Sequence, residues 1–108
     1  MLSSDVMRGF NSLLILSLLK KEDSYGYQVS QSIKQITDGQ YIMKETTLYS
    51  AFNRMEKQGW IESYSSDQTH GKPRTYYRIT PLGKIIYEEK KEEWQLTKKI
   101  VDQFIEGA

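Results

Sequence analysis

The sequence has no cysteine, which rules out a disulfide framework and thiolate ligands for a metal ion. Its only histidine, His70, has Asp67 as a single nearby ligand, and such a pair is too small to hold a metal. The sequence also lacks a glycine-rich phosphate-binding motif and a convincing pair of catalytic carboxylates. We therefore predict a protein that is not an enzyme, with no catalytic residues, no metal site and no cofactor.

Long apolar segments are also missing. The longest apolar run, residues 13–19, is far shorter than the roughly 20 residues that span a bilayer. It is not followed by the small-residue cleavage site of a secretory signal. We therefore expect a soluble cytoplasmic protein with no membrane partner. The 108 residues fit one domain, and a hydrophobic content of 38% allows only a modest core, which a second subunit would help to cover.

The formal net charge of +1 does not by itself indicate a nucleic-acid partner. The distribution of charge is more informative, because attraction to phosphate acts over about one Debye length. Residues 41–80 carry six basic and four acidic groups, and residues 70–78 carry three basic groups and no acidic one. The middle of the chain is therefore the part suited to an anionic partner.

Three helices are predicted in the first 60 residues. The first follows capping oxygens at residues 3–5 and runs to about residue 19. The second, residues 24–36, has Ser24 as its expected cap, and Gly39 follows its C-terminus. The third covers residues 45–58. Because residues 13–19 are apolar nearly all round, we expect the first helix to be covered on more than one side.

The third predicted helix has two different faces. Its apolar face consists of Leu48, Ala51, Phe52 and Met55. Its opposite face is rich in groups that donate hydrogen bonds to phosphates and base edges, namely Thr47, Ser50, Asn53, Arg54 and Lys57. Taken alone, this face is better explained as an ordinary solvated helix surface.

A β-hairpin and a long helix complete the chain. Residues 61–65 and 75–79 are enriched in β-branched and aromatic residues, and the polar segment between them carries His70, Lys72 and Arg74. Thr80 and Pro81 form a strong helix start, from which a helix is predicted to run over residues 81–105. The first three helices cannot cover a helix of this length.

This order of elements predicts a mainly α fold with a small β-hairpin, the winged helix-turn-helix. In such folds the third helix enters the major groove of DNA, and the hairpin lies against the backbone or the minor groove. We assign residues 1–80 to this DNA-binding unit. Residues 81–108 form a C-terminal dimerisation helix, which makes one compact unit with residues 1–20.

The sequence resembles the PadR family of bacterial transcriptional regulators, in particular short members with one C-terminal helix. The resemblance is collinear over essentially the whole chain. It lies in residues 25–27 (YGY), residues 47–49 (TLY), residues 54–61 (RMEKQGWI), residues 71–74 (GKPR), residues 76–80 (YYRIT) and Gly83. Met55 and Trp60 depart mildly from the leucine that is frequent in the family, and both remain apolar.

The resemblance implies a homodimeric repressor that binds a palindromic double-stranded DNA operator and is released by a small molecule or another signal. We predict major-groove insertion of Thr47, Ser50, Asn53 and Arg54. The expected phosphate contacts are Lys44, Tyr49, Lys57, Lys72 and Arg74. For Tyr49, burial in the core is an equally good interpretation, because aromatic residues at helical spacing usually pack inside.

A candidate effector site lies around Trp94, in the middle of the long helix. If two copies of this helix cross near a twofold axis, their Trp94 side chains approach each other, and Val6, Phe10 and Leu13 could line the same cavity. Paired aromatic faces stack planar ligands well, so a flat aromatic effector is the expected partner. The alternative is that Trp94 simply fills the dimer seam.

Two rival functions remain open at this point. A winged helix can serve as a protein-interaction module without sequence-specific DNA binding, because fold alone does not define function. Acidic or apolar residues in place of Asn53, Arg54, Lys72 and Arg74 would have favoured that alternative. In the second alternative, small-molecule binding is the chief activity, and a change in DNA binding is its output.

Overall fold

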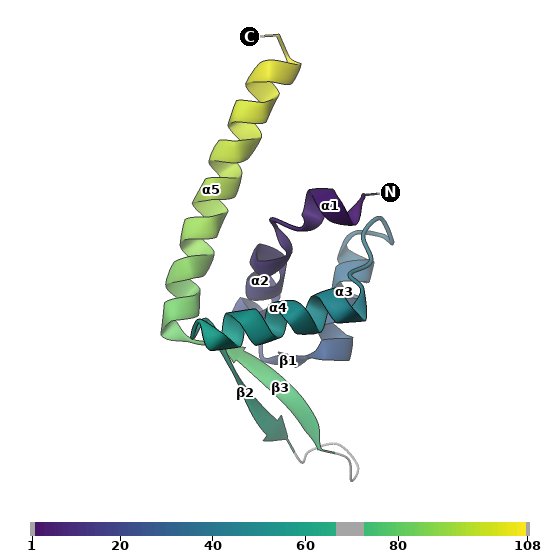
Figure 1. Ribbon diagram of the computed structural model, residues 1–108, viewed down its shortest axis with the longest axis vertical. Coiled ribbons are helices and arrows are strands. Elements are labelled where there is room, and N and C mark those ends of the chain that lie inside the picture. Colours follow the sequence, from purple (N-terminus) through teal and green to yellow (C-terminus); the bar gives the residue numbers. More distant parts are fainter. Residues whose placement is uncertain (1, 67–72, 108) are drawn as a thin grey trace.

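A computed structural model describes residues 2–66 and 73–107. Within these ranges, helices and a small three-stranded antiparallel sheet of order β1-β3-β2 form a winged helix-turn-helix, and α5 extends away from it (Figure 1). The predicted fold class is therefore confirmed. The elements are α1 (Ser4–Met7), α2 (Asn11–Lys21), β1 (Ser24–Tyr25), α3 (Gly26–Ile36), α4 (Glu45–Lys57), β2 (Ile61–Ser66), β3 (Arg74–Ile79) and α5 (Pro81–Ile105).

The core lies between α2, α3, α4 and the inner face of the sheet. The four apolar residues predicted for the inner face of the third helix, now α4, are all buried. Phe52 from this face is fully buried and stacks on Tyr77 of β3, with ring centroids 4.0 Å apart. Burial of one face fixes the rotation of α4, so its polar face must point away from the core.

The prediction of one continuous helix at the start of the chain is wrong. The structure divides it into α1 and α2, separated by Arg8, Gly9 and Phe10. The Phe10 N–H donates to the Met7 carbonyl oxygen over 2.9 Å, which closes a turn tighter than an α-helical one. Gly9 weakens a helix interior by about 1 kcal/mol relative to alanine, and this favours the break. The predicted cap at Ser3 is confirmed, since its side chain accepts from the Val6 N–H.

Ser24 was predicted to cap the second helix, and this is also wrong. Ser24 lies in β1, a two-residue strand that pairs with β3, and its hydroxyl donates to the side-chain oxygen of Gln28 over 2.6 Å. The N-cap of α3 is Tyr25, with no side-chain hydrogen bond to the helix. A strand of two residues carries no detectable alternation of apolar and polar residues, so it cannot be predicted from a local pattern.

The sheet has one buried and one open face. Ser24, Tyr77 and Ile61 belong to the inner face, and Tyr77 is only 7% exposed. On the outer face, Tyr76 pairs with Tyr25 on one side and with Tyr64 on the other. Successive residues of a strand point to opposite faces, which explains why Tyr77 is buried whereas Tyr76 is only half-buried.

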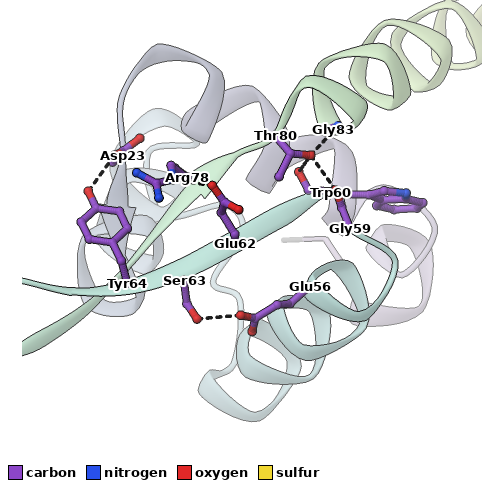
Figure 2. Close-up of polar contacts among 10 residues, drawn as sticks. All are labelled: Asp23, Glu56, Gly59, Trp60, Glu62, Ser63, Tyr64, Arg78, Thr80 and Gly83. Carbon is purple, nitrogen blue, oxygen red and sulfur yellow. Dashed lines mark hydrogen bonds and ion pairs between the residues drawn. The ribbon is translucent and has the colours of Figure 1, made fainter.

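The base of the hairpin is fixed to the end of α4 and the start of α5 (Figure 2). Gly59 ends α4 in a left-handed conformation, with φ of 79°. The Thr80 hydroxyl donates to the Gly59 carbonyl oxygen over 2.6 Å and accepts from the Gly83 N–H over 3.0 Å. Thr80 therefore caps α5 as predicted, with Pro81 in the first turn.

Helix α5 packs on α2 from its start up to Trp94, whose ring meets that of Phe10 at the N-cap of α2. Lys20 at the end of α2 forms an ion pair with Glu88 (3.3 Å) and lies over the Tyr87 ring. Beyond Trp94, α5 projects from the rest of the chain (Figure 1). Its second half exposes a set of large apolar side chains, namely Trp94, Leu96, Ile100, Val101, Phe104 and Ile105.

Candidate nucleic-acid interface

The polar face of α4 is open to solvent along its whole length. A shallow hollow runs along it, lined by Thr46, Tyr49, Ser50, Asn53, Arg54, Lys57 and Gln58. Five of the residues predicted to contact DNA, from Tyr49 to Lys57, lie in this hollow. The structure therefore brings them together on one surface, which is free of the core packing on the opposite side of the helix.

Tyr49 combines the two interpretations left open by the sequence. Its ring packs edge-on against Phe52, with centroids 5.7 Å apart, yet 41% of the residue remains exposed. Its hydroxyl lies directly against Gly26 at the start of α3. Tyr49 is thus a bridge between the core and the open face of α4.

Arg54 lies at the edge of the open face. One of its terminal nitrogens donates to the hydroxyl of Ser12 in α2, over 3.1 Å. It also lines a second hollow, between α4 and the start of α2, together with Arg8, Asn11, Thr46, Thr47, Ser50 and Ala51. Arg54, like Ser50, lines both hollows, and it also has a hydrogen-bond partner outside α4.

The remaining predicted contacts flank α4. Lys44 is exposed and is the N-cap of this helix, and Thr47 is half-buried in its first turn. Arg74 begins β3 and lies over the Tyr25 ring, 4.3 Å from its centroid. Lys72, like His70 and Asp67, lies outside the described residues.

The outer face of the wing carries a row of aromatic rings between two arginines. Tyr76 packs against Tyr25 (5.3 Å) and Tyr64 (5.8 Å), and Arg74 and Arg78 lie over the two ends of this row. Arg78 also donates to Glu62 over 2.6 Å (Figure 2). This carboxylate raises the pKa of Arg78 and offsets its charge.

Two further hydrogen bonds fix the orientation of the wing (Figure 2). The Ser63 hydroxyl donates to Glu56 of α4, and the Tyr64 hydroxyl donates to Asp23 in the turn before β1, each over 2.6 Å. The bond to Asp23 raises the pKa of the Tyr64 hydroxyl. The strand β2 is therefore tied to α4 and to the segment between α2 and β1.

Sequence reasoning missed several residues beside this surface. Thr46 and Gln58 line the hollow on α4, and Arg8 and Asn11 line the second one. Tyr27, 68% exposed at the start of α3, shares a third hollow with Tyr49 and Arg74. Helical spacing could have found Thr46, since it precedes Ser50 by four residues and Asn53 by seven. Arg8 and Tyr27 come from other elements, which periodicity cannot place.

The four residues of the candidate effector site differ in their surroundings. The Phe10 and Trp94 rings meet edge-to-face within a single protomer, with centroids 5.1 Å apart. Trp94 remains 41% exposed and Val6 57% exposed, whereas Leu13 is half-buried. The chain thus brings two of the four residues, Phe10 and Trp94, into direct contact as a half-open aromatic pair.

Residues 2–66 and 73–107 contain no group of three histidine, cysteine, aspartate or glutamate side chains placed to hold a metal ion. Among the helices described above, none combines the length and apolar composition needed to cross a membrane.

Comparison with known sequences links the chain to one family. The model of the transcriptional regulator PadR-like family matches residues 15–89, from α2 into α5. A protein of Lysinibacillus sphaericus, described as uncharacterized, is 45% identical over 107 residues, which cover 99% of this chain and 98% of that protein. The match therefore includes both the helix-turn-helix and the long helix.

Solved structures give the same result. A transcriptional regulator from Clostridium thermocellum is 54% identical, with a TM-score of 0.90 over 97% of this chain and 99% of that chain. A PadR family transcription regulator from Clostridium difficile is 42% identical, with a TM-score of 0.74 over 87% of this chain and 96% of that chain. These similarities extend over nearly the full length of each protein.

Proposed function

The chain belongs to the PadR-like family of transcriptional regulators, and from this premise we propose that it is a homodimeric repressor of a palindromic DNA operator. Proteins of this family are transcription regulators and not enzymes. The observation that carries the proposal is the open polar face of α4 beside an anchored wing. A helix with such a face fits the major groove, which is about 12 Å wide.

The proposed contacts divide by chemistry. Asn53 and Arg54 have the side chains best suited to base edges, because amides pair with adenine and guanidinium groups pair with guanine. Thr47 and Ser50 supply shorter hydroxyl contacts on the same face. The phosphates are held by Lys44, Tyr49, Lys57, Lys72 and Arg74, which fix the register of the helix in the groove.

Dimerisation rests on the unpartnered surface of α5. The second half of this helix exposes six large apolar residues to solvent, Phe104 at 82% and Ile105 at 76% among them. Closed twofold symmetry is the commonest way to cover such a surface. Two recognition helices related by a twofold axis would read two half-sites of a palindrome.

The proposed effector is a flat aromatic molecule that binds beside Trp94. Support comes from the edge-to-face pair of Trp94 and Phe10, which leaves part of the indole open. A planar ligand could stack on this open surface, and apolar walls are typical of small-molecule sites. Its binding would release the operator.

DNA binding is tested by selecting operators from random duplexes and measuring affinity against salt concentration. Replacement of Lys57 by alanine should reduce the slope of log affinity against log salt by about 0.9, the value for one lost phosphate contact. The control is Lys99→Ala, an exposed lysine near the far end of α5. If the selection enriches no duplex, the operator model is refuted. If the wild type and Lys57→Ala show equal salt slopes, Lys57 does not contact a phosphate.

Dimerisation is tested by sedimentation of the full chain at micromolar concentration. Phe104→Glu should convert dimers to monomers, because it places a charge in the proposed apolar seam. Gln103→Glu makes the same charge at the neighbouring position, which lines a polar surface of α5, and should leave the dimer intact. A wild-type monomer would contradict the proposal.

A further inference from the structure

Three consecutive residues at the start of α2 contact three different parts of the protein. Phe10, the N-cap of α2, packs on Trp94 of α5. Asn11 accepts a hydrogen bond over 2.6 Å from the hydroxyl of Tyr41, a residue of the segment that leads into α4. Ser12 accepts from Arg54 of α4 over 3.1 Å. This first turn therefore joins the aromatic pair on α5 to the recognition helix.

Both polar contacts have a buried residue as acceptor, and Arg54 supplies the donor of one of them from the exposed face of α4. Asn11 is 5% exposed and Ser12 is 8% exposed, so neither can exchange its partner freely for water. Burial also raises the pKa of the Tyr41 hydroxyl, which keeps it protonated as the donor to Asn11. A buried group that loses its partner carries a desolvation penalty, which makes these contacts sensitive to small movements.

The bond to Ser12 has a direct consequence for Arg54. Arginine has a long side chain with many rotamers, and a fixed guanidinium loses less entropy when it binds a base. Ser12 occupies one of the five N–H donors of Arg54 and leaves the others for a ligand on the open face. The hydroxyl thus orients the guanidinium without using up its capacity for bidentate contact.

We propose that Ser12 is a positioning residue for Arg54, and that the first turn of α2 transmits changes at the Trp94 ring to this arginine. The proposal rests on the proposed role of α4 in DNA reading. A ligand that displaces the Phe10 ring would move the N-cap of α2 and, two residues further, the Ser12 hydroxyl. Arg54 would then lose its orientation, and the proposed contact between its guanidinium group and a guanine of the operator would weaken.

The first experiment is a double-mutant cycle in operator affinity. Ser12→Ala should weaken binding about threefold to tenfold, the range for one hydrogen bond of this kind. In the Arg54→Ala background, the same change should have no further effect, because the group that Ser12 positions is gone. Ser12→Thr, which keeps a hydroxyl, should restore most of the affinity. Equal losses in both backgrounds would show a general structural role and overturn the proposal.

The second experiment tests the connection to Trp94. Phe10→Leu keeps an apolar side chain but removes the ring edge that contacts the indole. In this background, Ser12→Ala should change operator affinity by a factor close to one, because the Ser12 hydroxyl is no longer held in place. Ile36→Leu exchanges one apolar side chain for another at a residue of α3 that is 68% exposed and lies outside the proposed seam, and it should leave the loss caused by Ser12→Ala unchanged. An undiminished loss in Phe10→Leu would overturn the connection.

The cycle also separates this proposal from the proposed function. If the wild-type chain binds no duplex DNA, the operator model fails. The wild type and the three variants of the cycle are then compared by their unfolding free energies, where a hydrogen bond between Ser12 and Arg54 predicts non-additive changes. Additive unfolding free energies would overturn the positioning role.

Discussion

The hydroxyl of Tyr49 fills the space where a side chain at Gly26 would begin. A Cβ atom at position 26 would lie 2.8 Å from Cζ of Tyr49 and closer still to its hydroxyl oxygen. Gly26 starts α3 and Tyr49 lies in the first half of α4, so this contact joins the two helices of the helix-turn-helix. The absence of a side chain at one residue therefore sets the position of a proposed phosphate ligand.

Gly26→Ala should displace the Tyr49 ring and weaken operator binding. The displaced group is the end of a side chain, so the loss of stability should be about 1 kcal/mol, the low end for overpacking. Thermal unfolding and operator affinity measure the two effects. In the Tyr49→Ala background, Gly26→Ala should no longer destabilise the protein. If it remains equally destabilising there, the backbone of α3 and not the Tyr49 ring is responsible.

Gly83→Ala should reduce stability more than Gly26→Ala does, because the new methyl group would meet backbone atoms and not the end of a side chain. A Cβ atom at this position would overlap the Trp60 carbonyl oxygen and lie 2.8 Å from Ile79. Relief requires α5 to move away from the base of the wing, which should cost about 1–3 kcal/mol of unfolding free energy. Gly9→Ala is the matched control, because no other atom lies within 4 Å of a Cβ there. Equal stabilities of the two variants would contradict this account.

Local signals in the sequence predicted most of the fold. The apolar face of α4, its end at Gly59, and the start of α5 at Thr80 and Pro81 all agree with the structure. Each depends on residues close together in the chain. The strand β1 and the break at Gly9 were missed, because the first exists only through pairing with β3 and the second depends on a weak local preference.

The candidate site was predictable only in part for the same reason. Periodicity identified the open face of α4, from Ser50 to Lys57, because one helix presents it. It could not show that Arg54 reaches Ser12, which lies 42 residues earlier, or that Phe10 meets Trp94 on α5. Contacts of this kind follow from the packing of α2 against both α4 and α5, which no local pattern reports.

The pH dependence of stability should change when Tyr77 loses its hydroxyl. Burial, followed by the nearby charge of Glu56, raises the pKa of Tyr77 above its ordinary value of 10.0. The folded state therefore binds this proton more tightly than the unfolded state. This contribution to stability is fully present below pH 10.0 and is lost as the pH rises through the folded-state pKa.

Tyr77→Phe keeps the ring that stacks on Phe52 and removes the proton. Denaturant unfolding at several pH values should show a shallower loss of stability above pH 10.0 than in the wild type. Tyr27→Phe removes a hydroxyl from a residue that is 68% exposed and should leave the wild-type slope unchanged. A slope in Tyr77→Phe as steep as that of the wild type would show that Tyr77 does not contribute to alkaline unfolding.

The last prediction concerns the open surface of Trp94. Flat aromatic dyes should quench its fluorescence saturably, because a planar ligand can stack on an indole that is 41% exposed. Trp60→Phe removes the only other tryptophan, so the signal reports Trp94 alone. The quenching should disappear in Trp94→Ala while sedimentation still shows a dimer, and Phe10→Leu should weaken it by removing the ring that supports the indole edge-on. The same dyes should release the operator at matching concentrations. If a broad panel of dyes changes neither Trp94 emission nor operator affinity, Trp94 serves to pack the dimer seam, and the effector must act elsewhere.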